Sequence, residues 1–360
     1  MIDLLWSGIM QYLTFGRGNG LRVSEYALGT ATFGTRWGAG SERSETARML
    51  DRFADAGGTF LDTAESYQAG ESEEILGELL TTRRDQFTVA TKFAVGINPA
   101  SGVQGTGASR RTMIRAVEGS LARLRTDRID LLWVHFPDPV TPTTEIVRAL
   151  DDLVRSGKIL YAGLSNFPAW RTARAVTLAE VRGWAPIVGV QAEYSLVERS
   201  ADREILPMAE ALGLGATFWS PLGGGLLTGK YRHQSEGRLT TLGRLIHTED
   251  TEQKSTVLNT VLRIADDLGT IAAQVAIAWL RHRAAIATTG LVPVIGPRTL
   301  SQLDTYLAAL DVELSHEQYQ QLDEASRIPL GQPHESVAAR TPTLLGGSDI
   351  DFRQPTVPVA

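Results

Sequence analysis

Four side chains suited to acid–base chemistry, Asp62, Tyr67, Lys92 and His135, follow apolar runs of the sequence. Asp62, Lys92 and His135 each end a short and largely apolar run, and Tyr67 comes five positions after Asp62. Runs of this kind are typical of buried strands. The sequence therefore predicts a carboxylate, an ammonium and an imidazole at the ends of three strands, with a phenol in the loop above them.

Together these groups suit the donation of a proton to an oxygen that becomes negative. A tyrosine hydroxyl, with an ordinary pKa of about 10, is a poor proton donor at neutral pH, and a neighbouring ammonium lowers that pKa by favouring the phenolate. Lys92 would supply the ammonium, Asp62 would hold the lysine, and His135 would orient a carbonyl oxygen or relay a proton. Proton donation of this kind is one half of a carbonyl reduction.

Each of the four residues, taken alone, also has a purely structural explanation. Asp62 can cap a helix, Lys92 can pair with Asp62, Tyr67 can pack at the end of the fold, and His135 can bond a backbone carbonyl. All four at the ends of successive strands favour a catalytic group instead. We expect no metal here, because one histidine and one aspartate are too few ligands, the other histidines are scattered, and the chain has no cysteine.

The elements that must position these groups alternate in a regular order. From Tyr26 onward, apolar runs of four to seven residues alternate with helical stretches, and eight strand–helix pairs can be counted. The strands are expected at 27–31, 59–62, 88–92, 129–135, 159–164, 187–191, 215–219 and 292–295. The helices are expected at 45–56, 71–80, 111–124, 144–155, 169–180, 202–212, 252–268, 271–281 and 300–309.

The strands are continuously apolar, which indicates burial on both faces, as in a parallel sheet. We therefore expect an α/β fold, a (β/α)8 TIM barrel whose carboxyl strand ends carry the site. An open doubly wound sheet is the alternative, but no G-x-G-x-x-G follows the first strand to cradle a dinucleotide.

The two ends of the chain carry further expected features. Strand-like runs at 11–15 and 21–24, separated by a glycine-rich segment, predict a β-hairpin that plugs one end of the barrel. Residues 1–9 are either an extension or an ordered cap, and extra C-terminal helices lead to a loop or tail over 328–360. Because 360 residues show no linker and no short repeat, we expect a single domain with its core at 10–327.

The composition is that of an ordinary globular protein, with 43% hydrophobic and 21% charged residues. The formal net charge of -6 includes no basic run, so we expect neither nucleic acid nor a membrane as a partner. The apolar start of the chain lacks both the basic region of a signal peptide and the length of a membrane span. We expect a cytoplasmic protein, and a homo-oligomer remains open.

Five motifs stand in a recognisable order along the chain. They are Leu28–Gly34 (LGTATFG), Asp62–Tyr67 (DTAESY), Gly163–Asn166 (GLSN), Gln191–Ser195 (QAEYS) and Trp219–Lys230 (WSPLGGGLLTGK). Together these motifs resemble those of the aldo-keto reductase family, and the resemblance extends from Met10 to about Arg327. It implies a barrel that binds NADP(H) extended across its mouth, with the tetrad of Asp62, Tyr67, Lys92 and His135 complete.

The resemblance also implies a set of cofactor-binding residues. Ser165, Asn166 and Gln191 would hold the nicotinamide carboxamide, and Trp219 would stack on the nicotinamide ring. The glycine-containing loop after Trp219 would let backbone amides approach the pyrophosphate, and the start of the last barrel helix would receive the adenosine 2′-phosphate. The remaining implied residues are Gly29, Thr30, Ser220, Leu222, Gly225, Leu227, Lys230, Gly296, Arg298 and Gln302.

Arg298 suits a 2′-phosphate because its planar guanidinium can form paired hydrogen bonds with phosphate oxygens. The sequence departs from the family at Thr305-Tyr306, where an acidic residue followed by asparagine often contacts adenine. Tyr306 would then stack on adenine or pack against the protein.

Aromatic residues in the loops indicate the kind of substrate. Phe33, Trp37, Phe93 and Phe136 are expected to line the substrate site, with Trp170 nearby, and this set favours a bulky or apolar carbonyl compound. Segments 95–107 and 233–251 are predicted to form substrate-facing lids. The sequence does not separate a sugar, an aromatic aldehyde and a polyketide ketone.

The leading hypothesis is an NADPH-dependent, reversible reduction of an aldehyde or ketone to an alcohol, with the hydride from nicotinamide and the proton from Tyr67. One alternative is an NADP(H)-binding regulatory subunit, similar to the channel-associated members of the family, and another is a Schiff-base lyase that uses Lys92. The complete tetrad argues against the regulatory subunit. Asp62 beside Lys92 argues against the lyase, because an amine nucleophile must be neutral.

Overall fold

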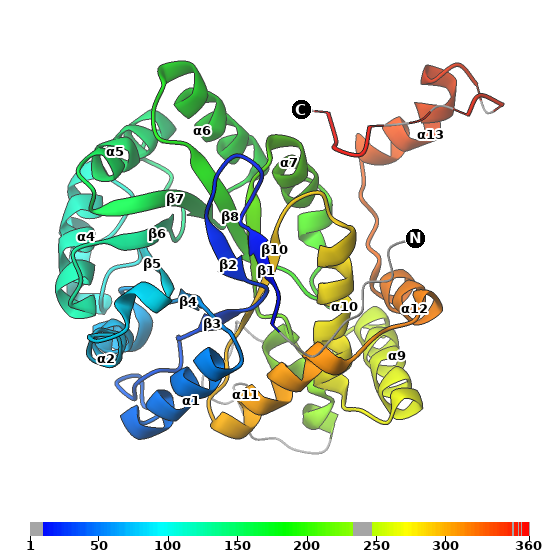
Figure 1. Ribbon diagram of the computed structural model, residues 1–360. Helices are drawn as coiled ribbons and strands as arrows, with labels where there is room; N and C mark the ends of the chain where they lie inside the picture. Colours follow the sequence, from blue (N-terminus) through cyan, green and yellow to red (C-terminus); the bar gives the residue numbers. More distant parts are fainter. Residues whose placement is uncertain (1–9, 233–246, 348, 352, 354, 360) are drawn as a thin grey trace.

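Eight parallel strands close into a barrel in the order β10-β3-β4-β5-β6-β7-β8-β9 (Figure 1). The bounds of the strands, with the two-stranded hairpin first, are β1 Tyr12–Thr14, β2 Arg22–Ser24, β3 Ala27–Gly29, β4 Phe60–Asp62, β5 Thr88–Phe93, β6 Ile129–Val134, β7 Ile159–Ser165, β8 Ile187–Glu193, β9 Gly215–Trp219 and β10 Leu291–Ile295. Every residue of β3, β4, β6 and β10 is buried, as expected for strands with helices outside and side chains inside. The predicted barrel is confirmed, and the open sheet is wrong.

The structure, a computed structural model, describes residues 10–232, 247–347, 349–351, 353 and 355–359. The predicted extension or cap at 1–9 and most of the predicted lid at 233–251 therefore lie outside the described residues.

Helices surround the strands (Figure 1). Their bounds are α1 Arg43–Asp55, α2 Glu71–Leu79, α3 Gly102–Gly105, α4 Arg110–Leu124, α5 Thr143–Arg155, α6 Ala169–Arg182, α7 Ile205–Leu212, α9 Glu252–Leu268, α10 Ala272–Ile286, α11 Leu300–Leu307, α12 His316–Ser326 and α13 His334–Leu344. Side-chain caps fix the start of helices that follow loops of the barrel mouth. Ser109 accepts a hydrogen bond from the Thr112 amide at the start of α4, and Thr299 accepts one from the Gln302 amide at the start of α11.

The N-terminal hairpin plugs the amino end of the barrel, as predicted (Figure 1). Phe15, directly after β1, is fully buried, and its ring meets the ring of Trp133 edge-on at 6.2 Å. Gly189 and Gly215 lie so close to the Phe15 ring that a Cβ on either would stand 2.4 or 2.6 Å from it. Glycine in these two strands therefore makes room for the plug.

The C-terminal region differs from the prediction of a loop or tail over 328–360. It contains α13, none of whose side chains is buried, and which lies apart from the barrel in Figure 1. Proline, glycine, serine and threonine dominate this region, and an amphipathic pattern that would indicate a helix is weak there. Among the described residues, no helix is both long and apolar enough to cross a membrane.

Candidate active site

Lys92 is fully buried at the carboxyl end of the barrel and joins two of the other predicted catalytic residues. Its ammonium forms an ion pair with Asp62, donates to the backbone carbonyl of Thr63 at 2.9 Å and donates to the Tyr67 hydroxyl at 3.2 Å. The structure thus brings Asp62, Lys92 and Tyr67 into one hydrogen-bonded chain.

The register of the parallel strands creates this arrangement. Asp62 stands opposite Ala90 across β4 and β5, so Lys92, two residues further along, faces the same side just above Asp62. Tyr67 begins η1, a short 3-10 helix over Tyr67–Gly70, and its amide donates to the carbonyl of Ala64 at 3.0 Å. That turn folds the phenol back over the lysine.

The charges in this chain are strongly coupled. Burial opposes the charge on Lys92, but the Asp62 carboxylate and the hydrogen bonds to Asp62 and Tyr67 outweigh it and raise the pKa of Lys92. The lysine is therefore an ammonium, which cannot act as the nucleophile of a Schiff-base lyase. Burial raises the pKa of Tyr67, and the Lys92 ammonium lowers it by a smaller amount.

This result corrects one prediction made from the sequence. The ammonium does favour the Tyr67 phenolate, as expected, but burial of the hydroxyl is the larger effect, and the pKa rises rather than falls. Tyr67 therefore keeps its proton at neutral pH and can donate it. Lys92 then stabilises the phenolate that forms as the proton leaves.

His135 completes the group as a neutral ring. Burial and the nearby Lys92 ammonium lower the pKa of His135 to about 3. Its ring meets the Tyr67 ring edge-on at 6.0 Å and stacks on Phe136 at 4.9 Å. A neutral imidazole suits the orientation of a carbonyl oxygen better than the relay of a proton as a charged acid.

A second layer of amide side chains holds the tetrad in place. Gln191 donates to Asp62 at 3.0 Å and to the Thr217 hydroxyl at 2.9 Å. Asn166, in the left-handed region at a φ of 58°, donates to the backbone carbonyl of His135 at 3.0 Å and accepts from the Trp219 indole at 3.2 Å. The side chains expected to meet the nicotinamide are thus connected to the tetrad itself.

Other predicted cofactor residues lie at or beneath this layer. Ser165 is fully buried and accepts from Asn166 at 3.1 Å. Thr30 is also fully buried, and its hydroxyl shares a hydrogen bond with Ser72 at 2.8 Å. A Cβ on Gly29 would stand 2.7 Å from Val294, so this glycine serves close strand packing. The Thr30 amide donates to the backbone carbonyl of Asp62 at 3.0 Å, so Thr30 supports the backbone of that residue.

The loop after β9 is a tight, glycine-dependent turn. Gly223, Gly224 and Gly225 all have positive φ angles, of 56°, 67° and 103°, which favour glycine. The amides of Gly223 and Gly225 donate to carbonyls of the loop itself, at 2.8 and 3.0 Å. A Cβ on Gly225 would stand 3.1 Å from the Lys230 side chain, so the lysine lies across this glycine.

In the same loop, Leu222 and Leu227 bury their side chains, and the Leu227 amide donates to the Leu222 carbonyl at 3.2 Å. The predicted role of this loop in holding the pyrophosphate stays a prediction. Ser220 is partly exposed, with a φ of 55°.

Arg298 and Gln302 lie at the start of α11, as the sequence predicts. The Gln302 side chain accepts from the Arg298 amide at 2.8 Å, and the Arg298 carbonyl accepts from Ser41 at 2.7 Å. No carboxylate of the described residues lies within 4.0 Å of the Arg298 guanidinium. Tyr306 is partly buried and packs against the core, and its stacking on adenine stays an alternative.

The four aromatic residues expected to line the substrate site fall into two pairs. Phe33 and Phe93 are 0% and 1% exposed and belong to the hydrophobic core, and their contact with a substrate stays a prediction. Trp37 and Phe136 are both 46% exposed and contact the tetrad, since the Trp37 ring meets the Tyr67 ring edge-on at 6.3 Å. Sequence position did not distinguish a ring that faces the core from one that faces the mouth.

Sequence reasoning missed Gln68 and gave no separate role to Glu65. Gln68 is buried with a φ of 50°, and its side chain accepts from the Trp37 amide at 2.8 Å and donates to the Ala39 carbonyl at 3.0 Å. It thereby joins the loop of Trp37 to the turn of Tyr67. No local signal marks Gln68, because its neighbours in the sequence are mostly small or polar.

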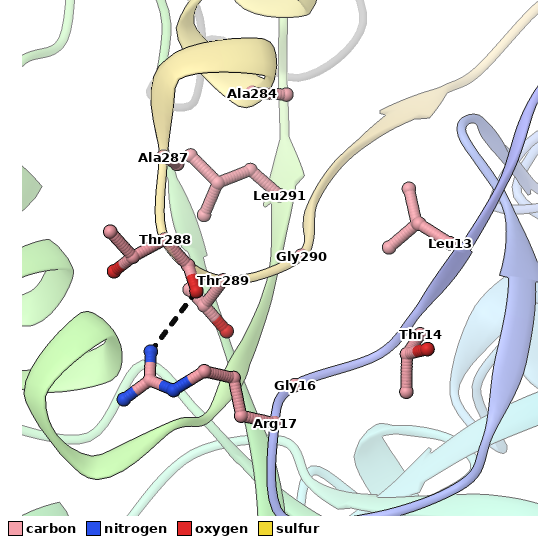
Figure 2. A pocket seen from close by; sticks show the side chains of 10 residues that line it. All are labelled: Leu13, Thr14, Gly16, Arg17, Ala284, Ala287, Thr288, Thr289, Gly290 and Leu291. Atoms are coloured by element: carbon pink, nitrogen blue, oxygen red, sulfur yellow. Dashed lines mark hydrogen bonds between the residues drawn. The ribbon is translucent and has the colours of Figure 1, made fainter. Parts of the chain in front are cut away.

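A cavity of about 460 Å3 lies at the opposite end of the barrel, between the hairpin and the connection from α10 to β10 (Figure 2). Arg17 in this cavity donates to the carbonyls of Thr288 at 3.0 Å and Glu210 at 2.6 Å. Its guanidinium is therefore engaged with the backbone, and the cavity is remote from the tetrad.

Among the described residues, one group of three possible metal ligands, Glu193, Glu198 and His247, has ligand atoms within 4.8 Å of one another. The Nε2 atom of His247 lies 3.0 Å from a Glu193 oxygen, so an ordinary hydrogen bond accounts for their closeness. The group lies beyond the end of β8 and includes no member of the tetrad. The absence of a metal at the tetrad stays a prediction.

A barrel with a buried lysine–aspartate pair, a tyrosine and a neutral histidine at its mouth is the arrangement of an oxidoreductase that takes a nicotinamide coenzyme. The sequence model of the Aldo/keto reductase family matches residues 26–327, and the chain belongs to that family. It is therefore an NAD(P)H-dependent oxidoreductase, and membership of this family supports carbonyl reduction as its reaction.

Relatives in other organisms extend over most of the chain. An uncharacterized oxidoreductase of Bacillus subtilis is 37% identical, covering 91% of this chain and 100% of its own length. A norsolorinic acid reductase of Emericella nidulans is 36% identical, covering 87% of this chain and 81% of its own length. An NADP(+) aryl-alcohol dehydrogenase of Phanerodontia chrysosporium is 32% identical, covering 88% of this chain and 86% of its own length.

Proposed function

We propose that this protein reduces the carbonyl group of an aryl aldehyde or aryl ketone to the alcohol, reversibly, with NADPH as coenzyme and Tyr67 as the proton donor. One observation carries this proposal: the buried Lys92 ammonium stands between the Asp62 carboxylate and the Tyr67 hydroxyl. A protonated phenol beside a fixed positive charge is suited to give a proton to an oxygen that gains negative charge.

The residues of this chain divide the work as follows. The neutral His135 and the Tyr67 hydroxyl orient the carbonyl oxygen by hydrogen bonds. As the carbonyl carbon accepts hydride, its oxygen takes the proton of Tyr67, so the carbon–oxygen double bond becomes a single bond and an O–H bond forms. The phenolate is held by Lys92, whose charge Asp62 fixes, and regains its proton from water. The reverse sequence oxidises the alcohol.

The residues around the tetrad suit a reduced nicotinamide coenzyme, which supplies the hydride when it is bound. Ser165, Asn166 and Gln191 offer hydroxyl and amide groups for a carboxamide, and the half-buried indole of Trp219 offers a flat face. Lys230 and Arg298 offer two cations for phosphates. Arg298, with no carboxylate of the described residues against it, supports NADPH over NADH.

The substrate class follows from the two exposed aromatic rings at the tetrad. Trp37 lies against Tyr67, and Phe136 lies against His135, so a flat apolar group next to the carbonyl would contact both. The aryl-alcohol dehydrogenase among the relatives supports the same substrate class. We therefore propose aromatic aldehydes as the first compounds to test.

The test follows NADPH absorbance with a panel of aromatic and aliphatic aldehydes and ketones. Tyr67→Phe should lose turnover by about a hundredfold or more, the contribution expected of a general acid, while still binding NADPH. Tyr12→Phe is the matched control, because the Tyr12 hydroxyl donates to the Gly57 carbonyl at the far end of the barrel. Turnover by Tyr67→Phe near that of Tyr12→Phe would remove Tyr67 from the mechanism.

A further inference from the structure

Two carboxylates hold the two ends of the segment 94–107, which lies between β5 and α4 and includes the predicted lid at 95–107. At its start, Glu65 accepts hydrogen bonds from the amides of Ala94 at 3.2 Å and Gly96 at 3.3 Å. At its end, Asp138 accepts from the Ala108 amide at 2.6 Å. Each carboxylate lies close in sequence to a member of the tetrad, because Glu65 precedes Tyr67 by two residues and Asp138 follows His135 by three.

The start of the segment is strained and needs its anchor. Ala94 has a φ of 100°, which is unfavourable for a residue with a Cβ and persists only where surrounding contacts enforce it. The bonds from Glu65 to the amides of Ala94 and Gly96 bracket this residue, and the Ala94 carbonyl accepts from the Gly107 amide at 2.8 Å. The Glu65 carboxylate therefore holds the one turn that leads directly out of the strand of Lys92.

The same segment touches the turn of Tyr67. The Ile97 side chain lies close to Gly70, the last residue of η1. A Cβ added to Gly70 would stand 2.8 Å from the Cδ1 atom of Ile97. A displacement of residues 94–97 would therefore change the packing against η1, the turn that begins with Tyr67. The segment borders the reacting group on one side and solvent on the other, since Val95 is 44% exposed.

The two anchors stand in different electrostatic surroundings. Burial raises the pKa of Glu65 to about 7, assisted by the Glu73 carboxylate of α2, while Arg123 of α4 and the two amide bonds lower it by less. The Arg123 side chain is itself paired with Glu73 at 2.7 Å, and the segment 94–107 contributes no charged side chain. Lys92 on β5 is committed to Asp62 and Tyr67.

Asp138 behaves in the opposite way. Burial alone would raise its pKa, but hydrogen bonds from the Ala108 amide, from Thr141 and from the Val140 amide together outweigh burial and lower the pKa to about 2. One end of the segment is thus held by an acid that stays charged near neutral pH, and the other end by an acid that changes charge there.

We infer that Glu65 is a positioning residue that fixes the segment 94–107 against the turn of Tyr67, and that proton loss from its buried carboxyl loosens the segment and weakens the binding of the carbonyl substrate. Both the neutral and the charged carboxyl can accept from the two amides, but the charged form also favours openings that expose it to water, because the folded protein holds the proton more tightly than the unfolded chain. The effect on substrate rests on the proposed function, whereas the effect on the segment does not. Tyr67 remains the proton donor throughout.

Hydrogen–deuterium exchange tests the effect on the segment without substrate or coenzyme. After correction for intrinsic exchange, the amides of 94–97 in the wild type should lose protection by about threefold to tenfold as pH rises from 6 to 8. Glu65→Gln, which keeps an acceptor oxygen but cannot titrate, should show the same protection at both values. Equal protection of the wild type at pH 6 and pH 8, or a pH step that persists in Glu65→Gln, would overturn the inference.

Kinetics with an aromatic aldehyde tests the consequence for substrate. The KM of the wild type should rise by about threefold to tenfold as pH rises from 6 to 8, with a smaller change in kcat, and Glu65→Gln should lack this step. Asp138→Asn is the matched control, because it weakens the other anchor of the same segment but removes no group that titrates near neutrality. Asp138→Asn should therefore change KM yet retain the step.

The two experiments separate the possible failures. A protein that shows the exchange step but reduces no carbonyl compound contradicts the proposed function and leaves the inference about the segment standing. A reductase whose KM step survives in Glu65→Gln contradicts the inference and leaves the proposed function standing.

Discussion

Removal of the Lys92 charge should destabilise the protein far more than removal of a lysine from a surface ion pair. Lys92 and Asp62 are 0% and 2% exposed, so Lys92→Met leaves a buried carboxylate whose one remaining side-chain partner among the described residues is Gln191. Breaking a buried pair by removing one partner costs about 3–5 kcal/mol of unfolding free energy. Methionine fills a similar volume, which keeps any cavity contribution small.

The matched control is Lys158→Met. Lys158 pairs with Glu118 on the surface, where the two side chains are 38% and 51% exposed. Exposed pairs contribute about 0–1 kcal/mol, because water and salt screen them. Urea denaturation at pH 7 of the wild type and both variants measures the difference, and a Lys92→Met cost no greater than that of Lys158→Met would refute the reasoning.

The double variant Lys92→Met with Asp62→Asn sharpens the same test. If the cost comes from a stranded charge, the double variant should regain much of the stability lost in Lys92→Met, because asparagine is neutral and can still accept from Gln191. Neither variant should recover turnover, since the cation that stabilises the Tyr67 phenolate is gone from both. A double variant less stable than Lys92→Met would show that packing, and not charge, holds the pair.

Three further predictions concern the coenzyme, the pH dependence and the start of the chain. Arg298→Ala should weaken NADPH binding by about tenfold to a hundredfold and NADH binding little, because it removes charge-assisted hydrogen bonds to the 2′-phosphate worth about 1.5–3 kcal/mol. Fluorescence titration measures both affinities, and an equal weakening of both would contradict this prediction. Because the pKa of Glu65 is raised from 4.5 to about 7, its contribution to stability is present below pH 4.5 and is lost as pH rises through 7. The unfolding free energy of Glu65→Gln should therefore rise relative to that of the wild type by up to about 3 kcal/mol as pH increases from 4.5 to 8, at about 1.4 kcal/mol per pKa unit. A difference in unfolding free energy that does not change with pH would contradict this prediction. Deletion of residues 1–9 should leave Tm and turnover unchanged, since Met10 already buries its side chain in the core, and a large fall in Tm would show otherwise.

Much of the barrel could be predicted because its strands and helices carry strong local patterns. The strand expected at 129–135 is β6, Ile129–Val134, and the helix expected at 252–268 is α9, Glu252–Leu268. Continuous apolar runs and helical periodicity arise from burial that each element experiences along its whole length. None of the side chains of α13 is buried, so its sequence has no comparable apolar periodicity from which the helix could be predicted.

The side chains of the mouth could be predicted by type and position but not by direction or charge. Phe33 and Phe136 both follow barrel strands, yet one is fully buried and the other 46% exposed. The positive φ angles of Gln68 and Ala94, which shape the turns around Tyr67, belong to residues that do not usually adopt them. Such features depend on contacts between distant segments, which no local pattern records.

The two acids of the Asp62–Tyr67 motif show why environment, rather than residue type, assigns a role. Asp62 and Glu65 are both buried and lie three positions apart, but Asp62 faces the Lys92 ammonium, whereas Glu65 faces two backbone amides and the Glu73 carboxylate. A cation pairs with the first acid and makes it a fixed support for proton donation. Burial and the Glu73 carboxylate raise the pKa of the second acid to about 7, by more than Arg123 and the two amides lower it. One motif can therefore hold both the support of the proton donor and a titratable anchor for the segment that borders it.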